Sequence, residues 1–241
     1  MVNIDNIPIN PVIWSPCFRI IPSRFPPIPV FDRVANESDF EILYEIEQAT
    51  NPRLRDEIGD ISLVHPEERV YGNGSSFIMA AFTHLPIMGT RFSNGSYGVY
   101  YAGSTLDTAI SETKYHREKF LRDFTCPSIE IDMRVLLADL KADLHDITKL
   151  RFDLSHIYDS NNYHFSQEFG RELRQEGLSS FGIKYESVRQ QGGECAAVFR
   201  PKALSNCRQG KHLCYVWDGE KISYIYQKKI IEHSVVMVSE A

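Results

Sequence analysis

The order of apolar and polar residues along the chain predicts several short strands. Residues 97–103 are rich in β-branched and aromatic side chains and are bounded by Gly95 and Gly103, which predicts a short buried strand. A period-two alternation predicts another strand at 129–135. Residues 215–224 predict a hairpin that turns at Asp218 and Gly219. Further strands are predicted at 144–147, 181–185 and 196–199.

Apolar residues at helical spacing predict three helices. Residues 38–41 have the form of a capping box, and the spacing that follows predicts a helix over 38–50. A second helix follows the 97–103 strand directly, with its cap in 104–107 and its end near Arg122. Its apolar stripe consists of Leu106, Ala109, Ile110, Thr113, Phe120 and Leu121. The third helix places Phe165, Phe169 and Leu173 on its apolar face and ends at Gly177.

The succession of these elements predicts one α+β domain. Seven of the twelve prolines lie in residues 1–30, and because proline fixes φ and lacks an N–H, only short extended pieces are expected there. Strands outnumber helices and do not alternate regularly with them, which argues against a doubly wound parallel sheet. We expect a proline-rich extension over 1–17 and a domain over 18–204 with an insertion at about 34–90. A C-terminal hairpin and tail over 205–241 is expected to pack on the same domain.

Charge and cysteine usage exclude several classes of function. The 241 residues include 26 Lys+Arg and 32 Asp+Glu, a net charge of −6, so the chain as a whole does not attract nucleic acid or an anionic membrane. An anionic substrate must therefore meet a local cluster of arginines. Five scattered cysteines without zinc-ligand spacing predict reduced thiols, a cytoplasmic location and no metal site. The N-terminus lacks a signal peptide's basic segment, and no apolar run approaches the ~18 residues of a membrane span.

The side chains best suited to catalysis concentrate in residues 91–112. Arg91 precedes the 97–103 strand, Tyr101 lies within it, and Glu112 lies in the helix that follows. A strand–turn–helix unit can bring all three to one cleft. Glu112 lies about 60° around the helix from Ala109, beside the buried stripe, which makes it a candidate functional acid.

Structural interpretations of these residues stand beside the functional ones. Arg91 and Glu112 could form a structural ion pair, with Tyr101 in the core. Cys195 could pair with a histidine as a nucleophile, but it opens an apolar strand and is interpreted as a buried, inert thiol. His116 is interpreted as a solvated helix position, and Arg189 as either a phosphate ligand or a solvated loop arginine.

Four ordered segments resemble the RES domain family, which is named for its Arg, Glu and Ser. They are an aromatic–Arg–Ile element at 18–20, an Arg–aromatic pair at 91–92 before the strand with Tyr101, the helix with Glu112, and a late segment at 185–188 that supplies Ser187. An apolar strand at 196–201 follows, as in the family. Together the segments extend from residue 18 to residue 201.

The resemblance implies a fold and an activity. RES proteins resemble ADP-ribosyltransferases, which implies an α+β fold with a split β-sheet core and flanking helices. They act on NAD, which implies cleavage of the nicotinamide–ribose bond by an NAD phosphorylase or NAD glycohydrolase, with inorganic phosphate as a candidate co-substrate. Mono-ADP-ribosylation of a protein and nucleotide binding without cleavage remain alternatives. The family also implies a bacterial toxin with a cognate antitoxin of the Xre/ParS type, and it leaves a homo-oligomer open.

The resemblance also implies roles for individual residues. Arg91 would clamp a phosphate oxygen, and Tyr101 would stack on nicotinamide or ribose. Glu112 would bond a ribose hydroxyl and offset the positive charge that develops in the transition state. Ser187 would position the ribose or the amide. The further substrate-binding candidates are Arg19 and Arg189.

Overall fold

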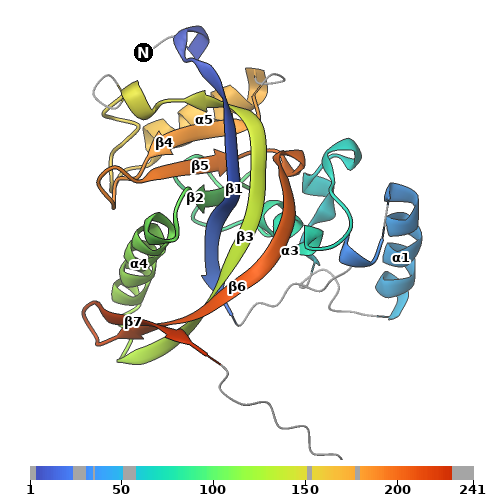
Figure 1. Cartoon of the computed structure of the whole chain (residues 1–241). Coiled ribbons are helices and arrows are strands. Elements are labelled where there is room, and N and C mark those ends of the chain that lie inside the picture. The colour runs from blue at the N-terminus through green and yellow to red at the C-terminus, as the bar shows by residue number, and fades with distance from the viewer. Residues whose placement is uncertain are drawn as a thin grey trace, which may run out of the picture.

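A single mixed sheet forms the centre of the computed structural model, which describes residues 4–23, 31–34, 36–50, 58–150, 154–176 and 180–229. Its strand order is β1-β2-β5-β4-β3-β6-β7, with an additional pairing of β1 with β3 (Figure 1). The strands are β1 (Ile9–Pro22), β2 (Tyr100–Gly103), β3 (Ile129–Asp146), β4 (Gly182–Glu186), β5 (Glu194–Val198), β6 (Leu204–Trp217) and β7 (Ile222–Lys228). The helices of eight or more described residues are α1 (Glu37–Thr50), α3 (Ser75–Thr83), α4 (Leu106–Asp123) and α5 (His164–Glu176).

The sheet is split into a long and a short part. The long part is β1-β3-β6-β7, and the short part is β2-β5-β4. They join where Phe18 of β1 pairs with Gly103 of β2, and again where the end of β3 pairs in parallel with Ile183 and Lys184 of β4. β3, α5 and β4 form one βαβ crossover, but all the other strand pairs are antiparallel. The sheet is therefore not built from repeated βαβ units, which confirms the α+β class and the split sheet.

The N-terminal residues belong to this sheet, contrary to the expectation of short extended pieces. β1 runs through Pro11 and Pro16 and pairs antiparallel with β3 from Ile9 to Pro22. The register shifts between Trp14 and Cys17, a local irregularity that accommodates the missing N–H of Pro16. Val12 and Cys17 are buried. Residues 9–17 thus form part of the core sheet, whereas Pro26, Pro27 and Pro29 lie outside the described residues.

The two strands predicted at 129–135 and 144–147 are one continuous strand, β3. Its middle section is rich in Leu, Ala, Asp and Lys, which favour helices more than strands. Pairing with β1 on one edge and β6 on the other satisfies the backbone here, and Leu136, Ala138 and Leu140 are buried. Tertiary pairing therefore overrides local propensity. The strand predicted at 97–103 is shorter than expected: β2 begins at Tyr100 and ends at Gly103.

The predicted helices are present, with corrections at their ends and faces. Asn36, and not the expected Ser38, caps α1, because its side chain accepts the Asp39 N–H at 3.0 Å. The α4 cap is Thr105, which accepts the Thr108 N–H at 3.2 Å. Two predicted stripe residues, Phe120 and Phe165, are exposed instead. The expected end of α5 at Gly177 lies outside the described residues.

Residues 58–90, which belong to the insertion expected at about 34–90, contribute α3 to the core. Asp32 caps α3 by accepting the N–H groups of Gly74 and Ser76 at 3.0 and 2.7 Å. A Cβ placed on Gly98 would lie 2.3 Å from the Phe82 Cα, so α3 packs directly against the backbone that leads into β2. A residue with a side chain does not fit this contact, which explains the glycine.

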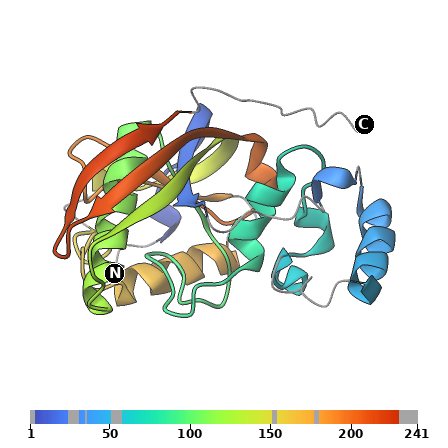
Figure 2. The ribbon, with the colours of Figure 1, turned by 90° about the horizontal axis from the view of Figure 1, so that it is seen from below.

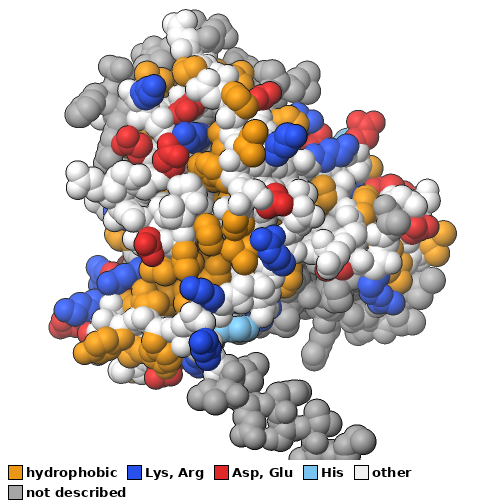
Figure 3. Space-filling view, in the orientation of Figure 1, with side chains coloured by type: hydrophobic (Ala, Val, Ile, Leu, Met, Phe, Trp, Pro, Cys, Tyr) orange, Lys and Arg blue, Asp and Glu red, His pale blue; other side chains and the backbone are white. Residues whose placement is uncertain are grey.

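The helices leave one side of the long strands uncovered by described residues. α3 and α5 lie behind these strands in Figure 1, as the view from below in Figure 2 shows. Hydrophobic side chains follow β1 and β3 along the middle of the uncovered side (Figure 3), and Ile9 and Ile13 of β1 are exposed. The predicted hairpin is confirmed: β6 and β7 are joined by a turn in which Gly219 has φ +110°.

Candidate active site

A cavity of about 310 Å³ lies between α4, residues 101–103 of β2, residues 18–20 of β1 and the 89–91 segment. The three residues expected in one cleft, Arg91, Tyr101 and Glu112, all line it. So do Arg19, which the sequence proposed as a further anion ligand, and His116 and Arg117, which it did not. Glu112 is the single carboxylate among the described lining residues, and it shares the cavity with three arginines, Arg19, Arg91 and Arg117.

Arg91 is fixed by backbone carbonyl groups and not by an acid. Its Nη1 donates to the carbonyl oxygens of Ile157 and Asp159 at 3.1 and 2.9 Å, and its guanidinium lies 4.7 Å from the ring centre of Tyr163. The side chain is buried to 7% exposure. Among the described residues, no ion pair joins Arg91 to Glu112, so the two do not form the alternative structural ion pair. The charge remains available to an anion.

Tyr101 holds the segment that carries Arg91. Its hydroxyl oxygen accepts the Phe92 N–H at 2.9 Å and lies 2.8 Å from the Thr90 Oγ1. Burial raises the pKa of Tyr101, so the phenol stays protonated. The Gln167 side chain adds a bond from α5 to the Thr90 carbonyl at 2.9 Å. Tyr101 therefore orients residues 90–92, in addition to presenting its ring to the cavity.

Ser187 acts on Glu112 and does not line the cavity. Its Oγ donates to Glu112 Oε1 at 2.6 Å. The same oxygen accepts the N–H groups of Arg189 and Gln190 at 3.0 and 2.9 Å. Two amide donors occupy the acceptor sites of the hydroxyl, so its only proton points at Glu112. The structure thus places Ser187 against the carboxylate, and not where the resemblance implied a contact with ribose or amide.

Arg19 brings a second guanidinium to the cavity from β1. Its Nη1 donates to the Tyr101 carbonyl at 3.3 Å, and the guanidinium lies 4.7 Å from the ring centre of Tyr100. Burial lowers the pKa of Arg19. No carboxylate forms an ion pair with Arg19 within the described part of the chain. A buried cation of this kind favours an anionic ligand that enters the cavity.

His116 and Arg117 are functional candidates that sequence reasoning did not identify. His116 Nε2 lies 4.0 Å from Glu112 Oε2, one helical turn away on α4. Desolvation and the positive charges of Arg189 and Arg91 lower the pKa of His116 to about 4, so the imidazole is neutral at pH 7. The side chain is half-exposed, yet it borders the cavity and is more than a solvated helix position. The i,i+4 spacing from Glu112 was the available signal.

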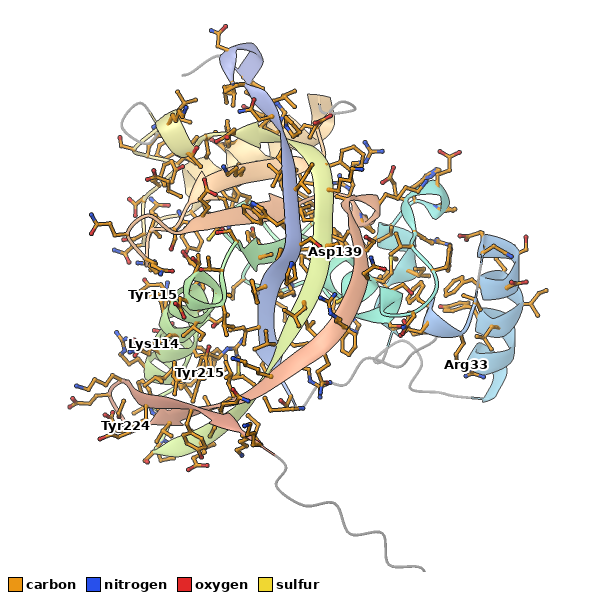
Figure 4. The ribbon with its side chains drawn as sticks, viewed as in Figure 1. Arg33, Lys114, Tyr115, Asp139, Tyr215 and Tyr224 are labelled. Carbon is orange, nitrogen blue, oxygen red and sulfur yellow. The ribbon has the colours of Figure 1, made fainter. Side chains whose placement is uncertain are left out.

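Arg189 is occupied elsewhere and does not line the cavity. Its Nη2 donates to the Ser160 carbonyl at 2.7 Å, and its guanidinium lies 3.2 Å from the ring centre of Tyr115. Tyr115 projects from α4 beside this loop (Figure 4). Arg189 therefore ties the 187–193 loop to α4, which is neither the solvated position nor the phosphate contact that the sequence left open.

The thiol alternative is not supported by the cavity. Cys195 lines it but is buried, and burial raises the pKa of its thiol, so a reactive thiolate does not form at neutral pH. Across the described ranges, no group of three or more His, Cys, Asp and Glu side chains is placed to hold a metal ion. No described helix is long and apolar enough to cross a membrane.

A family model and a curated relative both match the chain. A family model described as RES domain matches residues 66–218, which include Arg91, Tyr101, Glu112 and Ser187. The match also covers residues 66–90, which the sequence analysis assigned to an insertion. The uncharacterized protein y4oC of Sinorhizobium fredii (strain NBRC 101917 / NGR234) is 31% identical over 209 residues. This alignment covers 87% of the present chain and 86% of that relative.

Proposed function

The chain belongs to the RES domain family, and we propose that it consumes NAD by cleaving the nicotinamide–ribose bond, as an NAD phosphorylase or NAD glycohydrolase. The family has an ADP-ribosyltransferase-like fold, which fits the split sheet, and its members are NAD-related enzymes of toxin type. The observation that carries the proposal is one carboxylate, Glu112, held in a cavity whose other charged lining residues are the three arginines Arg19, Arg91 and Arg117. A site that only bound phosphates would gain nothing from this carboxylate.

Glu112 is suited to stabilise the transition state of this cleavage. Breaking the bond between C1′ and the nicotinamide nitrogen builds positive charge on the ribose, as in glycoside cleavage. A fixed carboxylate attracts that charge more strongly in the transition state than in bound NAD, which lowers the barrier. The bond from Ser187 fixes one carboxylate oxygen and leaves the second free for a ribose hydroxyl.

The arginines supply the anion binding that the net charge of the chain does not. Arg19 and Arg91 are each held by backbone carbonyl groups and an aromatic ring, which leaves both guanidinium groups able to bind an anionic ligand. Together with Arg117 they can neutralise the phosphates of NAD. Nicotinamide leaves as a neutral molecule, because the pyridinium already carries the positive charge. The reaction therefore requires no strong general acid.

Chromatography of NAD incubated with the purified protein tests the proposal, with and without phosphate. We expect release of nicotinamide. The identity of the ribosyl product shows whether phosphate or water is the acceptor. Glu112→Gln keeps the shape of the side chain but removes its charge, so turnover should fall by about 10²-fold or more at unchanged folding. The exposed Glu168→Gln on α5 is the matched control and should keep full activity.

Three results would change the proposed reaction. Unchanged NAD under all conditions, with no labelled protein, would refute the enzyme function and leave a nucleotide-binding module. Labelling of an added protein by ADP-ribose would select mono-ADP-ribosylation. Full activity of Glu112→Gln would remove the carboxylate from the mechanism.

The proposed role in the cell is that of a toxin controlled by an antitoxin protein of the Xre/ParS type. Depletion of NAD would arrest growth, so expression of the wild-type chain should stop growth and Glu112→Gln should not. Co-expression of an antitoxin encoded beside it should restore growth. Normal growth during high expression of active enzyme would contradict the toxin role.

A further inference from the structure

We propose that this cavity recognises only the nicotinamide mononucleotide half of NAD, so that the protein also cleaves free nicotinamide mononucleotide. The inference rests on the proposed function and specifies its substrate class. It follows from the size of the cavity, from the place of Glu112 within it and from the distribution of positive charge.

The cavity is too small to enclose a dinucleotide. Its volume of about 310 Å³ lies at the lower end of the roughly 300–1,000 Å³ that sites for drug-sized ligands span. NAD is two nucleotides joined through their phosphates, and a volume of this size suits one of them. A second cavity of about 260 Å³ is lined by other residues, including Phe82, Phe199 and Arg200, and shares none with the first. The adenosine half therefore has no enclosed continuation there.

Glu112 decides which half of NAD occupies the cavity. The ribose carbon that loses nicotinamide must lie beside this carboxylate, and Ser187 keeps the carboxylate in place. Tyr101, Tyr163 and Tyr185 are aromatic residues that line the same cavity, and aromatic residues suit a flat heterocycle. The nicotinamide ribose is therefore inside, and the adenosine extends outward from the phosphates.

The positively charged side chains of the cavity lie close to where the phosphate of the mononucleotide would bind, so binding does not need the second phosphate of NAD. Arg19, Arg91 and Arg117 line the same cavity as Glu112, so the phosphate attached to the enclosed ribose lies among guanidinium groups that can bind it. In free nicotinamide mononucleotide this group is a terminal phosphate and carries both negative charges of the molecule. In NAD the second phosphate lies farther from the ribose, at the mouth of the cavity or beyond. Loss of the adenosine half thus removes little of the recognition.

The chemical step is the same for both substrates. The C1′–N1 bond breaks and its electron pair leaves with neutral nicotinamide. An oxygen of water bonds to C1′ and its proton passes to solvent, so the mononucleotide gives ribose 5-phosphate. If inorganic phosphate is the acceptor, its oxygen bonds to C1′ instead and the product is ribose 1,5-bisphosphate.

Nicotinamide release from three substrates tests the inference in the full chain. The substrates are NAD, nicotinamide mononucleotide and nicotinamide hypoxanthine dinucleotide, each assayed with and without phosphate. We expect kcat/KM values for the latter two within about tenfold of the NAD value. A loss of more than tenfold for either, with NAD still cleaved, overturns the inference and leaves the proposed function standing. If no substrate releases nicotinamide, the proposed function fails and the inference with it.

Substitution of Arg117, one of the three arginines that line the cavity, gives an independent test. Arg117→Ala should lower kcat/KM for the mononucleotide at least as much as for NAD, because both place the same phosphate in the cavity. Arg122→Ala is the matched control, since Arg122 lies on the same helix, is exposed, and does not line the cavity. A loss confined to NAD would show that Arg117 contacts the outer phosphate, and would overturn the inference.

Discussion

At the residue scale, the hydroxyl of Ser187 fixes the position of the Glu112 carboxylate. Its oxygen accepts two amide N–H groups and its proton goes to Glu112, so the side chain is a positioning residue. Ser187→Ala should reduce kcat about tenfold or more, while KM changes by less than about twofold, because Glu112 loses its orientation. It should also lower stability by about 1–3 kcal/mol, since two partly buried amides lose their acceptor.

Steady-state kinetics and thermal unfolding together test the role of Ser187. The exposed Ser96→Ala serves as control and should change neither quantity. A Ser187→Ala protein that is less stable but has unchanged kcat would show that the hydroxyl is only structural.

The lowered pKa of His116 predicts how the stability of the protein changes at acid pH. Its pKa of about 4 in the folded chain lies below the ordinary value of 6.5, so between these pH values the unfolded chain binds a proton that the folded chain does not. Stability contributed by the neutral ring is therefore lost as pH falls through this window. His116→Gln cannot titrate, and its Tm should fall less between pH 7 and pH 4.5.

Between pH 7 and pH 4.5, the Tm of His116→Gln should fall by about 2 °C less than the Tm of the wild type. The difference is small because a half-exposed charge is strongly screened. His164→Gln, an exposed histidine on α5, is the control for general effects of removing a histidine. Equal acid-induced losses of Tm in wild type and His116→Gln would contradict the prediction.

At the scale of elements, the contact between α3 and the segment before β2 determines where the Arg91 loop lies. Gly98→Ala would place a Cβ 2.3 Å from the Phe82 Cα and 2.5 Å from the Ala81 carbonyl oxygen. Because these are backbone atoms of a helix, α3 must shift, and stability should fall by about 1–3 kcal/mol or more. Chemical denaturation measures the loss.

Gly210→Ala is the matched control for Gly98→Ala. Its nearest new contact is the end of a flexible side chain, Leu137 Cδ1 at 2.8 Å, and neither glycine has a positive φ. Gly210→Ala should therefore lower the free energy of unfolding by less than Gly98→Ala does. Equal losses in the two variants would mean that α3 is not rigidly packed against Gly98.

The elements that the sequence predicted well are those governed by local interactions. α4 needs only a capping threonine and a local apolar stripe, and the β6–β7 hairpin needs a turn with Asp218 and Gly219. β3 was missed as one strand because its Leu- and Ala-rich middle has no strand propensity of its own. α3 was missed because apolar residues surround it on nearly all sides, so it shows little amphipathic periodicity.

At the scale of the whole molecule, β1 binds the N-terminal residues into the sheet. Val12 is 4% exposed and packs into the core, whereas its neighbour Ile13 is 68% exposed on the other face. Val12→Ala should lower the free energy of unfolding by about 1–3 kcal/mol, and Ile13→Ala should change it by less than about 0.5 kcal/mol. Chemical denaturation of both variants checks this. Two neutral substitutions would instead indicate an extension outside the cooperative fold.

The sequence by itself determined the parts of the site that are close along the chain. Arg91, Tyr101 and Glu112 lie within 22 residues, so one strand–turn–helix unit carries them to the same cavity. The family resemblance rests on the same local unit and on short motifs at fixed order. Local propensity and spacing are sufficient for this, because the backbone path between these residues is short and regular.

Only the tertiary structure decided what each of these side chains contacts. Ser187 is 75 residues from Glu112 in sequence, and Arg19 reaches the cavity through the pairing of β1 with β2 and β3. Arg189 turns to Tyr115, while His116 and Arg117 border the cavity. Such contacts depend on long-range strand pairing and on the direction in which a side chain leaves its element. Neither is encoded in local periodicity, because both arise from the packing of segments that are remote in sequence.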